Sequence, residues 1–300
     1  ADHGWTIRAM VRDTAKAKAA WPAIGPLPQF MAGDAMILDD VMRAATESGK
    51  VAAIIHAVNP PGYRDWDKLV LPMIDHSITA ARAAGGARVV LPGTVYNYDP
   101  ATTPKIAETT PQSATSRKGR IRVALEDRLA TAAPDVPSLI LRAGDFFGPG
   151  IRSSWFAQAM VTPGKPVRKV TSMAPGVPHA YAYLPDLAET FAQLLDQPDK
   201  LRPHERLQFG GTWDADGRTI LETIREIVGG AIPERAFPWW LMRLASPFGG
   251  FPREAAELEP GWRHPMCLDN SRLVGLLGHE PQTPLRIAIV RTLIDMGCLA

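Results

Sequence analysis

The feature that most constrains this chain is an alternation of short apolar runs with amphipathic stretches. Four apolar runs predict strands, at 5–12, 51–58, 88–93 and 137–144. Runs that are apolar almost throughout are typical of parallel strands covered by helices on both faces. Between these runs, apolar side chains recur at helical spacing in three stretches, 37–45, 69–81 and 121–129. We therefore expect an α/β fold built on a Rossmann-like, doubly wound parallel sheet.

The alternation weakens after Pro149. A segment rich in proline and glycine follows, and a strand–helix pattern then returns near residue 180. This change predicts a dinucleotide-binding Rossmann-like domain over 1–150 together with about 180–197. The segments 151–179 and 198–300 are expected to form a smaller C-terminal substrate lobe.

The composition excludes several classes of protein. Hydrophobic residues make up 46% of the chain, which is enough for a large core. The 33 basic and 31 acidic residues nearly balance, so no electrostatic footprint for nucleic acid is expected. No apolar stretch has the length of a membrane span, and Cys267 and Cys298 lack metal-site spacing. These features predict a cytoplasmic protein with free thiols, no metal, and neither a nucleic acid nor a membrane as partner.

Two later segments carry the most specific motifs. They are "LRAGDFFGPG" at 141–150 and "AYAYLPDLAETF" at 180–191. They resemble segments of the extended or atypical short-chain dehydrogenase/reductases, the NAD-dependent epimerase/dehydratase-like family. The resemblance extends over the whole chain, with its segments in the same order as in that family. The resemblance implies a dinucleotide cofactor and hydride chemistry on a small molecule.

The start of the chain resembles the second strand of that family. No counterpart precedes it for the family's first strand or for its Gly-x-x-Gly-x-x-Gly turn, which holds the pyrophosphate. The chain is expected either to be a fragment of a longer protein or to have lost the motif. A fragment is favoured, because the neighbouring strands at 5–12 and 51–58 stay apolar although the absent strand would be central. Alone, the chain is expected to bind dinucleotide poorly.

The resemblance places several residues against a cofactor. Arg12 ends the first visible strand, where an arginine suits a 2′-phosphate, so NADP is favoured and NAD stays possible. Asp34 would lie beside the adenine, or it caps a helix. In the segment "AVNPP" the side chains of Ala57, Val58 and Asn59 are small, which would leave room for the ribose and nicotinamide. Pro60 and Pro61 would make the backbone rigid where it leaves the strand.

The family's catalytic set is a Ser/Thr with Tyr-x-x-x-Lys. Thr94 takes roughly the serine position, and Lys118 near a helix start would hold the ribose, but Ala114 occupies the tyrosine position. Three alternatives stay open. Tyr96 or Tyr98 reaches over from the preceding strand and donates the proton, or Lys118 works alone as acid/base, or no hydride chemistry takes place. Lys118 is otherwise an ordinary exposed lysine.

Further candidates follow from the two motifs. Arg142 would brace the site and Phe146 would form part of its wall. Asp186 has the position of a helix N-cap, while His179 and Tyr181 face the substrate or are structural. An aromatic-lined lobe or its core is indicated by four tryptophans, Trp155, Trp239, Trp240 and Trp262. The apolar segment 237–248 alternatively indicates a partner such as a second copy in a homodimer, with core packing favoured.

The leading functional hypothesis is an NAD(P)-dependent oxidoreductase that transfers hydride to or from a carbonyl or hydroxyl of a small organic molecule. The first alternative is a non-catalytic NADP-binding sensor or regulatory protein. The second is a nucleotide-sugar epimerase.

Overall fold

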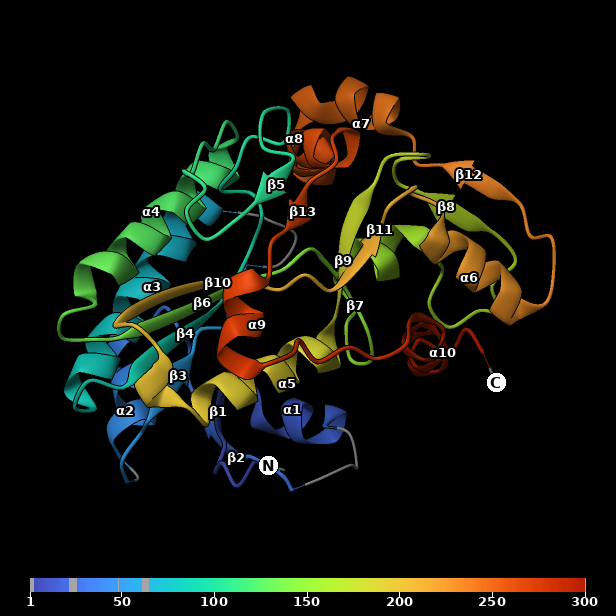
Figure 1. Ribbon diagram of the computed structural model, residues 1–300. Helices are drawn as coiled ribbons and strands as arrows, with labels where there is room; N and C mark the ends of the chain where they lie inside the picture. Colours follow the sequence, from blue (N-terminus) through green and yellow to red (C-terminus); the bar gives the residue numbers. More distant parts are fainter. Residues whose placement is uncertain (1–2, 22–25, 48, 61–64, 300) are drawn as a thin grey trace.

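A parallel sheet covered by helices forms the larger body of the protein (Figure 1). The structure is a computed structural model that describes residues 3–21, 26–47, 49–60 and 65–299. The strand order is β10-β6-β4-β3, and every neighbouring pair is parallel. These strands are β3 (Ala53–Ile55), β4 (Arg88–Gly93), β6 (Ser138–Arg142) and β10 (His204–Gln208).

Helices pack on both faces of this sheet. One face carries α3 (Trp66–Ala83) and α4 (Arg117–Ala132), which share a core cluster with β4 and β6. On the other face lie α5 (Leu184–Leu195) and α9 (Ser271–Leu277), which pack on the same strands and on β10. The α/β doubly wound architecture expected from the apolar runs is confirmed.

The N-terminal strands form a sheet of their own. β1 (Arg8–Val11) and β2 (Gln29–Ala32) pair in parallel, flanked by α1 (Thr14–Ala20) and α2 (Leu38–Thr46). Within the described residues nothing pairs with the outer edge of β3, and 60% of the Ile55 surface is exposed. The expectation that all four strands are covered on both faces is therefore wrong for β3.

The smaller body is built around a three-stranded sheet of β7 (Asp145–Phe147), β9 (His179–Tyr183) and β11 (Thr212–Asp214). Two parallel pairs accompany it: β8 (Val170–Ser172) with β12 (Glu234–Ala236), and β5 (Lys105–Ile106) with β13 (Cys267–Leu268). The helices are α6 (Thr219–Val228), α7 (Trp239–Ala245), α8 (Gly250–Arg263) and α10 (Leu285–Asp295). Short π and 3-10 turns span Phe156–Met160, Pro198–Lys200 and Ser246–Phe248.

The two bodies interleave along the chain. The predicted division at residue 198 leaves β10 in the lobe, whereas β10 pairs with β6 and α9 packs against it. Asp186 joins the bodies: its carboxylate accepts the backbone N–H and the hydroxyl of Thr283, each at 2.6 Å. The N-cap assigned to Asp186 is wrong, since the N-cap of α5 is Tyr183.

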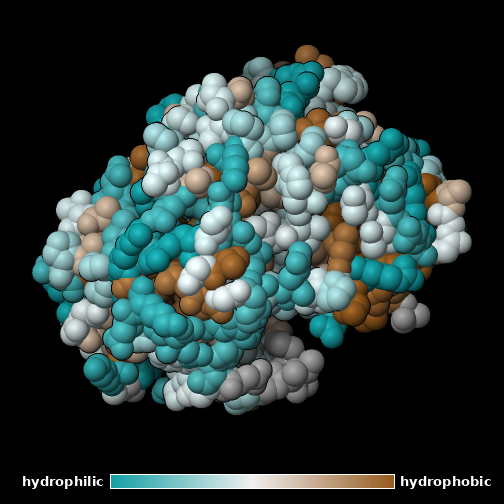
Figure 2. All heavy atoms as spheres, in the orientation of Figure 1, coloured by the Kyte–Doolittle hydropathy of each residue, from teal (hydrophilic) through white to brown (hydrophobic). Residues whose placement is uncertain are grey.

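The face of the molecule drawn in Figure 2 is mostly hydrophilic, with scattered apolar patches. Core packing holds for Trp239, but Trp240 is 63% exposed and Phe248 is 91% exposed. Both cysteines are free. None of the described helices has the length and apolar character needed to cross a membrane.

Candidate functional site

A cavity of about 320 Å³ lies where the two bodies meet, beyond the ends of β4 and β6. The larger body contributes the loop after β4 and the first residues of α4. The smaller body contributes the beginnings of β7 and β9 and one face of α8. The described residues that line the cavity are Val95, Tyr96, Tyr98, Pro100, Thr115, Ser116, Gly144, Asp145, Trp155, His179, Ala180, Ala256, Glu257, Leu258, Pro260, Gly261, Trp262 and Met266.

The N-terminus of α4 is fixed against the loop that follows β4. The Ser116 hydroxyl accepts the backbone N–H of Gly119 at 2.9 Å, a side-chain N-cap. A Cβ atom at Gly119 would lie 2.1 Å from the carbonyl oxygen of Tyr96. Only glycine therefore permits this close approach, which places Tyr96 and Ser116 on the same cavity.

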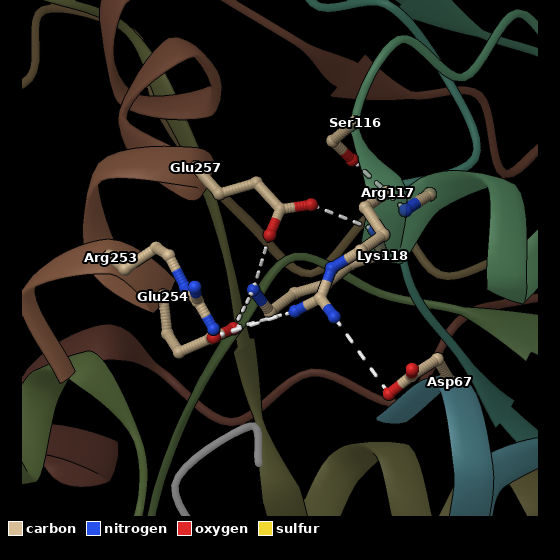
Figure 3. Close-up of polar contacts among 8 residues, drawn as sticks. Asp67, Ser116, Arg117, Lys118, Arg253, Glu254 and Glu257 are labelled. Atoms are coloured by element: carbon tan, nitrogen blue, oxygen red, sulfur yellow. Dashed lines mark hydrogen bonds and ion pairs between the residues drawn. The ribbon is translucent and has the colours of Figure 1, made fainter. Parts of the chain in front are cut away.

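Lys118 is fully buried at this helix end, so the alternative of an ordinary exposed lysine is wrong. Its Nζ donates to Glu254 and, at 2.6 Å, to Glu257, both on α8 (Figure 3). The Glu257 carboxylate also accepts the backbone N–H of Lys118 at 2.8 Å. Two carboxylates from the smaller body thus neutralise a cation of the larger body.

The same cluster extends to α3. Arg117 Nη2 lies 3.3 Å from Glu254, and Arg117 Nη1 lies 3.8 Å from Asp67 (Figure 3). Burial raises the pKa of Glu257, but hydrogen bonds from Lys118 outweigh it and hold the pKa below its usual value. Glu257 is therefore a carboxylate at neutral pH, and it lines the cavity.

His179 and Asp145 form a second polar pair in the cavity wall. His179 Nε2 lies 2.6 Å from Asp145 Oδ2, and the imidazole stacks on the indole of Trp262 with 3.9 Å between ring centroids. A Cβ atom at Gly144 would lie 2.1 Å from the carbonyl oxygen of Ala180, so β7 and β9 approach closely only because residue 144 is glycine.

A buried polar network lies behind the cavity. Arg142 donates to Glu126, which also accepts from Asn97 at 2.9 Å and from Gln112 at 2.8 Å. Burial raises the pKa of Glu126, and the charge of Arg142 offsets this only in part. Arg142 therefore does brace the core of this region, with its guanidinium 5.3 Å from the centroid of the Tyr98 ring.

A second cation of α4 lies one helical turn beyond Lys118. The Arg122 guanidinium is 4.8 Å from the centroid of the Trp66 ring. Burial, reinforced by the Arg122 charge, lowers the pKa of His56 to about 3. His56 follows β3 directly, so the charge of Arg122 acts at the exit of that strand. Lys118 and Arg122 repeat the four-residue spacing of the family's Tyr-x-x-x-Lys.

The predicted cofactor residues lie at strand ends. Arg12 is exposed just after β1, and Ala57, Val58 and Asn59 are exposed just after β3. Asp34, between β2 and α2, accepts the backbone N–H of Met36 at 2.9 Å and is not a helix N-cap. Arg12 and Asp34 have the chemistry to hold the adenosine end of a dinucleotide, and the exposed segment 57–59 leaves room for its nicotinamide end. The described residues supply no glycine-rich cradle for its pyrophosphate. Pro61 lies outside the described residues.

The other predicted site residues divide between wall and core. Tyr96 lines the cavity, whereas Thr94, Lys118, Arg142 and Phe146 are absent from its described lining. Thr94 Oγ1 lies 3.5 Å from Asn97 Oδ1, and Phe146 packs against the core beneath α5. Of the two candidates on β9, His179 lines the cavity and Tyr181 is buried in the core of the smaller body. Sequence reasoning missed the partners Glu254, Glu257, Asp145 and Trp262.

Solved structures share this fold over almost the whole chain. A UDP-glucose 4-epimerase from Bifidobacterium longum in complex with NAD+ and UDP has 13% identity and a TM-score of 0.74, covering 99% of this chain and 93% of that one. A UDP-glucose-4-epimerase from Stenotrophomonas maltophila, with bound NAD and formylated UDP-arabinopyranose, has 16% identity and a TM-score of 0.72, covering 98% and 91%. The Bordetella bronchiseptica enzyme WbmG in complex with NAD has 17% identity and a TM-score of 0.68, covering 99% and 89%.

The chain therefore has the extended short-chain dehydrogenase/reductase fold of NAD-dependent epimerase and dehydratase structures, as its motifs predicted. No protein-family model matches the sequence, and neither does the sequence of any curated protein. At such low identity the likeness establishes the fold, and the chemistry has to be argued from the site.

Proposed function

We propose that this chain is an NAD(P)-dependent oxidoreductase of the epimerase/dehydratase-like short-chain type. It acts on a carbonyl or hydroxyl group of a small organic molecule. The observation that carries the proposal is the cavity beyond the ends of β4 and β6, because ligands of open α/β sheets bind outside the carboxyl ends of the strands. The NAD bound in the structural neighbours supports the cofactor class.

The nicotinamide, when bound, accepts or supplies the hydride. In the reductive direction the carbonyl carbon gains that hydride and its oxygen gains a proton from the protein. Arg12 offers an exposed cation for a 2′-phosphate, which favours NADP. Asp34 faces the adenine end, and Ala57, Val58 and Asn59 leave room for the ribose and nicotinamide.

Two arrangements of α4 compete for the proton transfer. In the first, Lys118 holds the ribose and Tyr96, which lines the cavity, supplies the proton. In the second, Lys118 takes the acid position, with Glu257 connecting it to the cavity, and Arg122 takes the ribose position. We favour the second, because Arg122 lies one helical turn beyond Lys118 and packs on Trp66 at the start of α3, the helix that follows β3. Thr94 is proposed in both to polarise the substrate oxygen.

The experiment uses the protein expressed from its complete reading frame and measures NADPH fluorescence on binding and NADPH oxidation with a panel of aldehydes, ketones and quinones. We expect Arg122→Ala to weaken NADPH binding at least tenfold, and Lys118→Gln to abolish turnover while NADPH still binds. Tyr96→Phe should retain most activity, and circular dichroism verifies folding of each variant. Turnover that persists in the double variant Thr94→Ala/Lys118→Gln would contradict the assignment.

A non-catalytic dinucleotide-binding sensor is the second candidate. Two observations favour it. Ala114 occupies the tyrosine position, and the one lysine of α4, Lys118, is already ion-paired with Glu254 and Glu257, which restrains it from acting as acid or base. NADPH binding without oxidation of any substrate, unchanged in Lys118→Gln, is the result expected of a sensor. A nucleotide-sugar epimerase is supported by the UDP-sugar epimerases among the neighbours. Because epimerisation consumes no cofactor overall, its test is the conversion of UDP-glucose to an isomeric UDP-sugar in the presence of NAD+, measured by chromatography.

A further inference from the structure

The charges on the cavity wall are unsuited to a nucleotide sugar. None of the described lining residues is lysine or arginine, whereas two of them, Asp145 and Glu257, carry carboxylates. Proteins hold diphosphates with arginine, lysine or helix N-termini, because uncompensated negative charge is costly away from water. The N-terminus of α4 reaches this wall, but Ser116 and Glu257 already accept the N–H groups of Gly119 and Lys118. A diphosphate in this cavity would therefore lie beside two further negative charges.

The nearest cations are already neutralised. Lys118 is enclosed by Glu254 and Glu257, and Arg117 lies between Glu254 and Asp67 (Figure 3). Recruiting either cation to a phosphate would leave a carboxylate without its partner, and one of these, Glu254, is only 4% exposed. This electrostatic arrangement therefore disfavours anionic ligands generally.

The remaining wall is apolar and aromatic. Trp155, Trp262, Leu258 and Met266 supply most of it, with the rings of two tyrosines beside them. The few polar groups are hydroxyls at the start of α4, the His179–Asp145 pair and the Glu257 carboxylate. Apolar walls with a small number of converging polar groups are typical of sites for compact, mostly apolar ligands.

The size of the cavity agrees with this chemistry. Its volume of about 320 Å³ is at the low end of the roughly 300–1,000 Å³ found for small-molecule sites. We infer that the occupant is a small, largely apolar molecule without negative charge, carrying one or two hydrogen-bonding groups, and that nucleoside diphosphate sugars are excluded. This inference rests on the proposed function, since it names the substrate class of the same site.

The test measures binding without cofactor, through the fluorescence of the cavity tryptophans and by calorimetry. The probes are two pairs of equal shape that differ in charge: benzamide with benzoate, and cyclohexanecarboxamide with cyclohexanecarboxylate. UDP-glucose is the fifth probe. We expect at least one carboxamide to bind, tenfold or more tightly than its carboxylate, and UDP-glucose to give no response.

A matched pair of glycine variants ties this binding to the cavity. Gly261 lines it, and a Cβ atom there meets nothing within 4 Å, so Gly261→Leu fills open space at the wall. Gly230 is equally open and is not part of the lining, so Gly230→Leu is the control. Carboxamide affinity should fall at least tenfold in Gly261→Leu and stay unchanged in Gly230→Leu.

The inference is overturned if neither carboxamide binds, if UDP-glucose or a carboxylate binds as tightly as a carboxamide, or if Gly261→Leu leaves carboxamide affinity unchanged. Failure of the proposed function gives a different pattern. Carboxamides then bind as expected, but no carbonyl compound oxidises NADPH. Conversely, NADPH oxidation that depends on a UDP-sugar would support the proposed oxidoreductase activity and refute the inferred substrate class.

Discussion

Asp145 holds His179 through a 2.6 Å contact between Oδ2 and Nε2, at the point where β7 and β9 begin side by side. The two residues are 34 positions apart in the chain. Both line the cavity, and the stacking of His179 on Trp262 extends the contact to α8. The pair therefore joins two strands and a helix of the smaller body at the wall of the candidate site.

This pair should show measurable energetic coupling. In a double-mutant cycle with Asp145→Asn and His179→Asn, we expect a coupling energy of about 1–3 kcal/mol, the range for hydrogen bonds to charged groups. Urea unfolding at neutral pH provides the four free energies. The exposed pair Arg218 and Glu222, 3.9 Å apart, is the control and should show no coupling beyond error. Equal coupling in the two cycles would contradict a specific role for the first pair.

Gly144 should be intolerant of a methyl group. In Gly144→Ala the new Cβ would lie 2.1 Å from the carbonyl oxygen of Ala180, so β7 and β9 must separate. Overpacking of this kind costs about 1–3 kcal/mol or more. Thermal and urea unfolding measure the loss, with Gly230→Ala as the neutral control because its Cβ meets nothing within 4 Å. If the two variants were equally stable, the close approach of the strands would be refuted.

Lys118 should contribute strongly to stability. Lys118→Met removes the ammonium and leaves Glu254 and Glu257 without their shared cation, and breaking a buried ion pair in this way costs about 3–5 kcal/mol. The matched control is Lys105→Met, which breaks an ion pair at the surface and should change the free energy of unfolding little. A Lys118→Met variant as stable as this control would mean that the cluster is not buried as described.

His56 should make the protein less stable in acid. Burial and the Arg122 charge lower its pKa to about 3 in the folded state, from an ordinary value of 6.5. The unfolded chain therefore binds the extra proton between these values, and stability is lost as pH falls below about 6.5. From pH 8 to pH 5 this corresponds to about 2 kcal/mol.

The measurement compares urea unfolding of the wild type and His56→Gln across that pH range. The variant should lose about 2 kcal/mol less than the wild type on acidification, because glutamine does not titrate. His279→Gln, at an exposed position, should keep the wild-type slope. An unchanged slope in His56→Gln would show that His56 is accessible to protons in the folded state.

The buried strands were the most predictable part of the fold. The range 88–93 matches β4 to the residue, because a strand covered on both faces requires an uninterrupted apolar run. β2 (Gln29–Ala32) went unpredicted, since it has four residues and its two end residues are exposed. Short strands at a sheet edge bury too little surface to leave a distinct pattern.

The site was predictable in its residue types but not in its pairings. Lys118 stood out in the sequence, yet its partners lie 136 and 139 positions later on α8. Glu254 and Glu257 occur among other charged residues of a helix, so local pattern could not distinguish them from a solvated face. Asp145 lay inside a recognised motif and His179 was a candidate, but their contact depends on the pairing of β7 with β9.

Helix α8 carries both Trp262 of the cavity wall and the two carboxylates that bind Lys118. A change in the tilt of this helix would therefore alter the shape of the cavity and the geometry of the ion pairs together. Phe251, near the N-terminal end of α8, is not among the described lining residues, but its ring lies 6.1 Å from that of Trp155 in the wall, so a substitution there would act on the cavity indirectly. Substrate preference would then evolve through the orientation of α8, while the residues that contact the ligand stay the same.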